Sequence, residues 1–122
     1  MQQLTWNQDG LIPVITQQYD SKQVLMHAWM NKQALDLTIK TGWVTYWSRS
    51  RQVLWQKGES SGNQQTLIEL RVDCDGDTLL CMVNQQGAAC HTGREHCFYY
   101  ALSPKASEFV VTQSRPTDHK PT

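Results

Sequence analysis

Short apolar runs, separated by polar turns, recur along most of the chain. Residues 11–19 are rich in β-branched side chains, which predicts a strand. Pro13 cannot donate to a sheet ladder, so it places this strand at an edge or lies among its first residues. Residues 20–22 are polar and predict a turn, and 24–30 predict a second strand. The chain therefore opens with two short strands.

One segment has signals of a helix. Asn31 can cap a helix over residues 32–40, and Gly42 stands where a left-handed C-terminal cap belongs. Leu35 and Ile39 are four residues apart, which gives a narrow apolar stripe. The pattern predicts a single short helix.

The remaining apolar runs predict strands and hairpins. Residues 66–72 alternate apolar and polar positions, which predicts a strand. A polar bend follows, and residues 78–83 form the returning strand, so the two segments are typical of a hairpin. The other predicted strands cover 43–47, 53–55, 98–102 and 109–111. The prediction is a β-rich α+β fold in one domain, 1–122, with about 103–122 forming a peripheral edge strand and a polar tail.

Composition narrows the class of protein. The 122 residues suit one domain, and no run approaches the roughly 20 apolar residues of a membrane span. The N-terminus lacks the order of a signal peptide, so we expect a cytoplasmic protein. The formal net charge is zero, which excludes a general basic field for nucleic acid. Four cysteines in such a chain favour metal binding or catalysis over disulfides.

Three cysteines are candidate zinc ligands: Cys74, Cys90 and Cys97. Fifteen residues separate the first two and six separate the last two, so the spacing fits neither a ribbon nor a finger. A catalytic zinc keeps three protein ligands and one open position, whereas a structural site needs a fourth ligand, which Cys81 or His91 could supply. Cys81 stands in an apolar run and reads better as a core thiol. Unconnected thiols are the alternative.

Asp73, Asp75 and Asp77 alternate along the bend, and carboxylates brought together there repel unless a cation offsets their charge. Mg²⁺ takes a few carboxylate oxygens and completes its shell with water or substrate phosphates. A calcium EF-hand is excluded, because Gly76 stands at the fourth loop position and Asn84 at the twelfth. A solvated acidic turn remains the alternative.

Basic and hydroxyl side chains in glycine-bearing loops suit phosphate, although exposed loops have the same composition. No Walker loop is present. His91, next to Cys90, could ligate metal or transfer protons, and His96 is a weaker candidate. The candidate substrate-binding residues are Arg49, Arg51, Lys57, Ser60, Asn63, Thr92 and Arg94.

Four motifs in order resemble one enzyme family. They are Trp47-Ser-Arg-Ser-Arg51, Trp55-x-Lys57-Gly-Glu59-x-Ser-Gly62-Asn63, Asp73-Cys-Asp-Gly-Asp77, and Ala89-Cys-His-Thr-Gly93 with Cys97-Phe-Tyr99. Together they resemble phosphoribosyl-AMP cyclohydrolase, the enzyme of histidine biosynthesis that opens the adenine ring. The resemblance runs from about residue 24 to residue 99.

The resemblance implies a homodimer with a small pseudo-barrel of mixed sheet and active sites at the subunit interface. It assigns Mg²⁺ to the three aspartates. It assigns Zn²⁺ to Cys90 and Cys97 of one subunit and Cys74 of the other, with one ion of each metal per subunit. His96 stands where the family usually has a small hydroxyl residue, so the fourth zinc ligand stays open.

The implied reaction is hydrolysis of the N1–C6 bond of 1-(5-phosphoribosyl)-AMP by a zinc-activated water, giving the formimino-AICAR ribonucleotide. His91 is the candidate proton donor or general base. A zinc nucleobase deaminase is a rival, but its Pro-Cys-x-x-Cys signature is absent. The rival from another class is a zinc-stabilised β domain that binds nucleotides or single strands on Trp43, Trp47 and Trp55.

Overall fold

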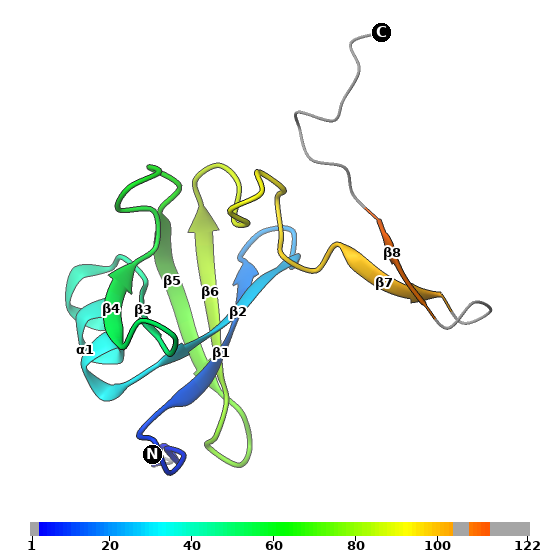
Figure 1. Ribbon diagram of the computed structural model, residues 1–122. Helices are drawn as coiled ribbons and strands as arrows, with labels where there is room; N and C mark the ends of the chain where they lie inside the picture. Colours follow the sequence, from blue (N-terminus) through cyan, green and yellow to red (C-terminus); the bar gives the residue numbers. More distant parts are fainter. Residues whose placement is uncertain (1–2, 104–107, 113–122) are drawn as a thin grey trace, which may run out of the picture.

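The computed structural model describes residues 3–103 and 108–112, so the predicted tail after residue 112 lies outside the described part. Eight strands and one helix follow in the order β1 (Ile12–Gln18), β2 (Val24–Met30), α1 (Lys32–Thr41), β3 (Thr45–Ser48), β4 (Val53–Gln56), β5 (Gln65–Val72), β6 (Leu79–Gln85), β7 (Tyr100–Ser103) and β8 (Glu108–Val111). The predicted β-rich fold with one short helix is confirmed (Figure 1).

The main sheet is mixed, with strand order β2-β1-β6-β5. β1 pairs antiparallel with β2 and parallel with β6, and β6 pairs antiparallel with β5. The expected pseudo-barrel is not confirmed, because the described sheet is open and ends at β2 and β5. Placing β1 at an edge is wrong, since it is an interior strand. Pro13 is tolerated because the pairing with β6 begins only at Val14.

The helix caps match the sequence prediction. The Asn31 side chain accepts a hydrogen bond from the backbone N–H of Ala34 at 2.8 Å, and Gly42 adopts the left-handed conformation with φ of 78°. Within the described residues, no helix is long and apolar enough to cross a membrane.

One face of the sheet packs against α1 and the β3–β4 hairpin. The buried core comprises mainly Ile12, Val14, Leu25, Met26, Met30, Leu35, Val44, Tyr46, Leu79, Cys81 and Val83. The core reading of Cys81 is confirmed, and burial raises the pKa of its thiol to about 12.

A hydrogen-bonded chain of side chains crosses this core. The Tyr46 hydroxyl donates to Oε1 of Gln65 at 2.6 Å and lies 2.7 Å from the Thr16 hydroxyl. Gln65 in turn donates through Nε2 to Oε1 of Gln85 at 2.8 Å. Burial raises the pKa of Tyr46 well above its ordinary value, so the phenol stays neutral and donates. The network fixes β3, β5 and β6 relative to one another, beneath the loop that follows β6.

Candidate functional site

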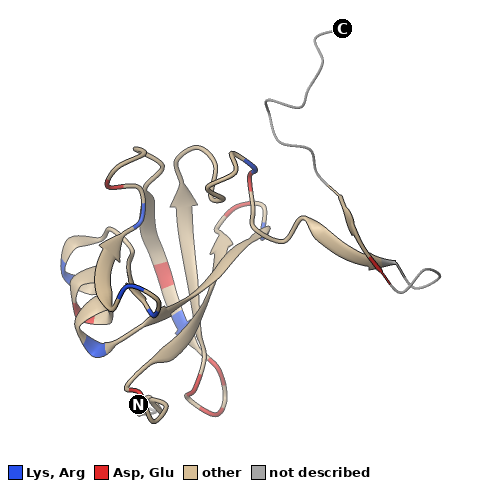
Figure 2. Ribbon diagram, in the orientation of Figure 1, with Lys and Arg blue, Asp and Glu red and all other residues tan. Residues whose placement is uncertain are grey.

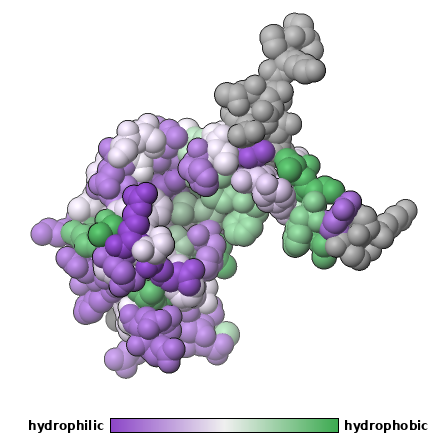
Figure 3. Space-filling model, in the orientation of Figure 1, coloured by the Kyte–Doolittle hydropathy of each residue, from purple (hydrophilic) through white to green (hydrophobic). Residues whose placement is uncertain are grey.

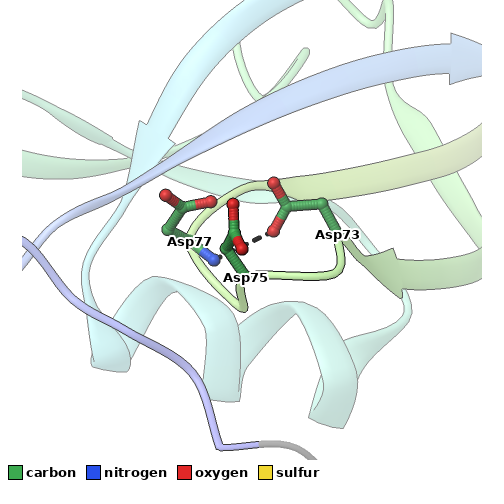
Figure 4. Close-up of side chains that lie close together, drawn as sticks. All are labelled: Asp73, Asp75 and Asp77. Carbon is green, nitrogen blue, oxygen red and sulfur yellow. Dashed lines mark hydrogen bonds between the residues drawn. The ribbon is translucent and has the colours of Figure 1, made fainter.

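The acidic bend between β5 and β6 holds three carboxylates close together. Asp73 follows β5, and its Oδ1 accepts hydrogen bonds from the backbone N–H of Asp77 at 3.0 Å and of Thr78 at 3.2 Å. One carboxylate oxygen from each of Asp73, Asp75 and Asp77 lies within 4.8 Å of the others, and all three residues are exposed (Figure 4). Figure 2 shows this acidic group at one end of the sheet. The bend therefore folds the alternating aspartates onto one side.

Crowding and hydrogen bonding shift the pKa values of Asp73 and Asp77 in opposite directions. Slight desolvation opposes a low pKa for Asp73, but the backbone hydrogen bonds from Asp77, Thr78 and Gly76 outweigh it and lower the pKa. The hydrogen bond to Asp73 and the neighbouring negative charges raise the pKa of Asp77. Exposed, hard oxygen donors at this spacing fit Mg²⁺, which would offset the repulsion and keep positions for water or phosphate.

The loop that follows β6 brings Cys90 and Cys97 together. A tight turn after Cys90 is closed by a hydrogen bond from the backbone N–H of Gly93 to the Cys90 carbonyl at 3.0 Å. The Thr92 hydroxyl donates to Sγ of Cys90 at 3.0 Å. The backbone N–H of Cys97 donates to the carbonyl of Leu25 at 2.7 Å, which ties the second cysteine to β2. Both cysteines are thus held by local hydrogen bonds.

The two thiols influence each other's ionisation. Burial opposes a low pKa for Cys90, but hydrogen bonds from Thr92 and from the Cys97 thiol lower it. Although Cys97 is exposed as a residue, protein surrounds its thiol closely enough that burial, together with the Cys90 charge, raises its pKa to about 11. One thiolate is therefore favoured and a second is penalised. A thiophilic cation such as Zn²⁺ would remove that penalty, so the pair fits two ligands of a zinc site.

Cys74 does not join this pair within the chain. It lies in the exposed acidic bend, at the opposite end of β6 from the cysteine loop (Figure 1). A strand of 7 residues spans roughly 23 Å at about 3.3 Å per residue. Among the described residues, the aspartates form the only group of three or more metal-ligating side chains close enough to share an ion. One chain therefore brings together two of the three predicted zinc ligands.

Lys57 is a cation that interacts electrostatically with both thiols. Its Nζ donates to the Ala89 carbonyl beside Cys90 and lies 5.8 Å from the centre of the Trp55 ring. Burial lowers the pKa of Lys57, while the charges of Cys97 and Cys90 oppose that shift. Lys57 thus connects β4 with the cysteine loop.

A cavity of about 410 Å³ lies along β4 and the loop that follows it. It brings together three predicted substrate-binding residues, Arg51, Lys57 and Ser60. Arg49 lines a separate cavity of about 360 Å³, and its guanidinium stacks on Trp29 at 4.5 Å from the ring centre. Arg49 and Arg51, which belong to one motif, therefore line different cavities.

The other predicted residues take distinct positions. Arg94 is buried, with its guanidinium 3.8 Å from the centre of the Tyr99 ring. Asn63 packs against Gly87, where an added Cβ would lie 2.4 Å from the Asn63 side-chain oxygen. His91 is exposed in the turn after Cys90. His96 accepts a hydrogen bond at Nδ1 from the backbone N–H of Phe98 at 3.1 Å, which fixes its ring.

Sequence reasoning missed two contributors to this region. Tyr99 supplies the aromatic face under Arg94, and Glu59 places a carboxylate in the cavity with Arg51. Tyr99 was part of a recognised motif, but nothing local marks it as the partner of a residue five positions earlier. Glu59 belongs to the second motif, but nothing local marks it as a neighbour of Arg51 in the cavity.

Comparison with known proteins identifies the family of the chain. The family model described as phosphoribosyl-AMP cyclohydrolase matches residues 26–99, which include both candidate metal groups. The chain is 57% identical over 116 residues to phosphoribosyl-AMP cyclohydrolase 2 of Pseudomonas fluorescens, covering 95% of this chain and 79% of the relative.

Two further relatives are named phosphoribosyl-AMP cyclohydrolase. That of Alkalilimnicola ehrlichii is 60% identical over 88% of this chain and 76% of its own length. That of Halorhodospira halophila is 59% identical over 94% of this chain and 80% of its own length. On these matches, the chain belongs to the phosphoribosyl-AMP cyclohydrolase family and is a hydrolase.

Proposed function

We propose that this chain hydrolyses 1-(5-phosphoribosyl)-AMP at the N1–C6 bond, giving the formimino-AICAR ribonucleotide of histidine biosynthesis, in the cytoplasm. The observation that carries the proposal is the family match over residues 26–99, joined to relatives 54–64% identical and named for this activity. The matched span contains the thiol pair, the aspartates and the cavity lined by Arg51 and Lys57, so it covers the groups to which the proposal assigns the chemistry.

Zn²⁺ is held by Cys90 and Cys97 of one subunit and by Cys74 of the partner subunit in a homodimer. The support is the contact between the first two thiols and the position of Cys74 at the far end of β6. When bound, zinc supplies a water molecule that is nucleophilic near neutral pH. The Thr92 hydroxyl donates to Sγ of Cys90, which favours the thiolate and orients this ligand.

Mg²⁺ is held by Asp73, Asp75 and Asp77. The support is the spacing of their oxygens, within 4.8 Å, and their exposure, which leaves room for further ligands. When bound, magnesium supplies contacts to substrate phosphate. Each subunit then holds one ion of each metal.

The basic cavity is the proposed phosphate-binding surface. Arg51 offers a planar fork of donors, Lys57 a point charge and Ser60 a hydroxyl. Trp55 lines the same cavity and can stack on a ring of the nucleotide. Arg49, Asn63 and Arg94 are assigned to the substrate from the family pattern alone.

His91 is the proposed proton donor. In the reaction, the water oxygen becomes bonded to C6, the N1–C6 bond breaks, and a proton must reach N1. His91 is an exposed imidazole adjacent to Cys90 and can deliver that proton, and such a group contributes about 10²–10⁴-fold to the rate. His96 is less suited, because its Nδ1 already accepts a hydrogen bond from Phe98.

The test is conversion of 1-(5-phosphoribosyl)-AMP, followed by ultraviolet absorbance and by mass spectrometry of a product that has gained one water. The intact chain is expected to turn over, and Cys90→Ala to lose turnover and zinc together. Cys81→Ala is the matched control, since this thiol lies in the core. Full activity in Cys90→Ala would refute the zinc assignment, and a folded, metal-loaded dimer without turnover would refute the function.

A further inference from the structure

One lysine of the described chain turns its side chain inward. Lys57 is half-buried, whereas Lys22, Lys32 and Lys40 are exposed. Figure 3 shows a mainly hydrophilic surface over α1 and the β3–β4 hairpin, where a lysine ammonium ordinarily reaches water. Nζ of Lys57 instead donates to the carbonyl of Ala89, a residue that is only 2% exposed. Because removing an ammonium from water costs free energy, this position depends on compensating contacts.

The backbone of Lys57 is fixed on both sides. Its own N–H donates to the carbonyl of Val44 at 2.9 Å. Gly58 follows with φ of 83°, and a Cβ there would lie 2.4 Å from the backbone of Asn63. Glycine is the residue that such a positive φ and such a close approach require. The Lys57 side chain therefore leaves the end of β4 in a defined direction.

A stack of aromatic rings supports the ammonium from the core. Nζ of Lys57 lies over the Trp55 ring, 5.8 Å from its centre, and a cation in this position is attracted by the ring. The centre of the Trp55 ring lies 5.0 Å from that of Tyr46. Tyr46 is fully buried, and its hydroxyl donates to Gln65. The core thus fixes Trp55, and Trp55 supports Lys57.

The carbonyl that Lys57 holds belongs to the peptide bond between Ala89 and Cys90. This peptide lies in the loop that follows β6, where residues 86–99 contain no helix or strand. The backbone N–H groups of Ala89 and Cys90 donate to carbonyls within the same loop, so these bonds shape the loop without tying it to a strand. The bond from Lys57 ties the peptide before Cys90 to the end of β4, while Cys97 is tied to β2.

Charge gives a second link between Lys57 and the thiol pair. Among the described residues, no ion pair with a carboxylate includes Lys57. Burial lowers the pKa of Lys57, and the charges of Cys97 and Cys90 raise it, so the ammonium lies within electrostatic reach of both sulfur atoms. Three thiolates around one Zn²⁺ leave an excess negative charge, which a fixed cation nearby offsets.

We infer that Lys57 is a positioning residue for the thiol pair: its hydrogen bond to Ala89 and its charge fix Cys90 beside Cys97 before metal or substrate binds. This role is additional to the phosphate contact proposed above, since an ammonium can donate to several acceptors at once. It rests on the proposed function only for the identity of the metal.

The experiment compares Lys57→Met with Arg51→Met in the full chain, without substrate. Arg51 is the matched control, because it lines the same cavity but its backbone N–H donates to Ser48 in its own turn. Each protein is stripped by chelation, and zinc affinity is measured by competition with a chelating dye. Lys57→Met is expected to bind zinc about 10–100-fold more weakly, the usual loss when a group that orients a metal ligand is removed. Amide hydrogens of residues 89–97 are expected to exchange faster in metal-free Lys57→Met. Arg51→Met is expected to keep the wild-type values of both.

Two further measurements distinguish positioning from a general loss of structure. Near-ultraviolet circular dichroism and sedimentation first establish that each variant has the fold and mass of wild type. Lys57→Ala leaves space for an added amine, so propylamine is expected to restore part of its zinc affinity and to restore none in Lys57→Met. In the wild type, ¹⁵N NMR is expected to show that the ammonium protons of Lys57 exchange with water more slowly than those of the exposed Lys32.

Wild-type zinc affinity and loop exchange in a folded Lys57→Met would overturn the inference, as would Lys57 ammonium protons that exchange as fast as those of Lys32. Should Lys57→Met fail to fold, the NMR measurement on the wild type decides. Turnover is measured separately in the wild type. Weak zinc binding by Lys57→Met, together with a wild type that has no turnover, supports the positioning role and contradicts the proposed function. Turnover by a wild type whose zinc affinity is independent of Lys57 does the reverse.

Discussion

If the zinc site is shared between subunits, two inactive variants should restore each other when mixed. Cys74→Ala keeps Cys90 and Cys97, and Cys97→Ala keeps Cys74. A mixed dimer of the two therefore contains one complete triad and one site that lacks two thiols. Each variant alone should be inactive, because every site in its homodimer lacks one thiol. Within one chain, β6 spans roughly 23 Å between the bend with Cys74 and the loop with Cys90 and Cys97.

The size of the recovery follows from random pairing. Equal amounts of the two variants give about half mixed dimers, and one of the two sites in each is complete, so about one quarter of wild-type activity should return. The assay is turnover after the variants have exchanged subunits, with zinc and magnesium present. The slow rise of activity after mixing should follow the subunit exchange measured by mass spectrometry.

A matched control distinguishes sharing from general stabilisation. Cys90→Ala mixed with Cys97→Ala should recover nothing, because both thiols must come from the same chain. Recovery of about a quarter in this control, or near wild-type activity of Cys74→Ala alone, would refute the shared site.

Three further predictions concern single residues. Asp75→Asn should lose most of the magnesium response of turnover while zinc content, measured by metal analysis, stays at the wild-type level. Gly58→Ala should destabilise by about 1–3 kcal/mol more than Gly62→Ala in urea unfolding, because both have positive φ but only at Gly58 would Cβ meet backbone, at 2.4 Å. An equal cost would contradict that. Burial raises the Cys81 pKa from 9.0 to about 12, so the folded state favours the neutral thiol. The contribution of the neutral Cys81 thiol to the free energy of unfolding is complete below pH 9 and falls by about 1.4 kcal/mol per pH unit between pH 9 and 12. The free energy of unfolding of Cys81→Ala should therefore decline less steeply than that of wild type over this range.

The parts of the fold that depend on neighbouring residues could be predicted from the sequence. The Asn31 and Gly42 caps act over one helical turn, and the bend at the aspartates follows from an alternating segment and an apolar run on either side of Gly76. Strand order could not be predicted, since the parallel pairing of β1 with β6 joins residues more than 60 positions apart. Pro13 allowed either an edge strand or a position among the first residues of a strand, and the pairing of β1 with β6 decides for the second.

The candidate site shows the same difference between local contacts and contacts of distant segments. The three aspartates lie within five consecutive residues, so the sequence alone could group Asp73, Asp75 and Asp77. The contact of Arg49 with Trp29, and the difference between the cavities of Arg49 and Arg51, depend on how β2 and β3 pack. The separation of Cys74 from Cys90 follows from the predicted strand between them, whereas the contact of Cys90 with Cys97 depends on how the loop after β6 folds.

The most direct test of a hydrolase that needs both zinc and magnesium is to restore turnover by adding the metals back. The protein is stripped by chelation, and opening of 1-(5-phosphoribosyl)-AMP is followed after zinc and magnesium are restored singly and together. We expect little turnover with either ion alone and full turnover with both, at one zinc per chain. Full turnover by protein shown to contain neither metal would contradict it.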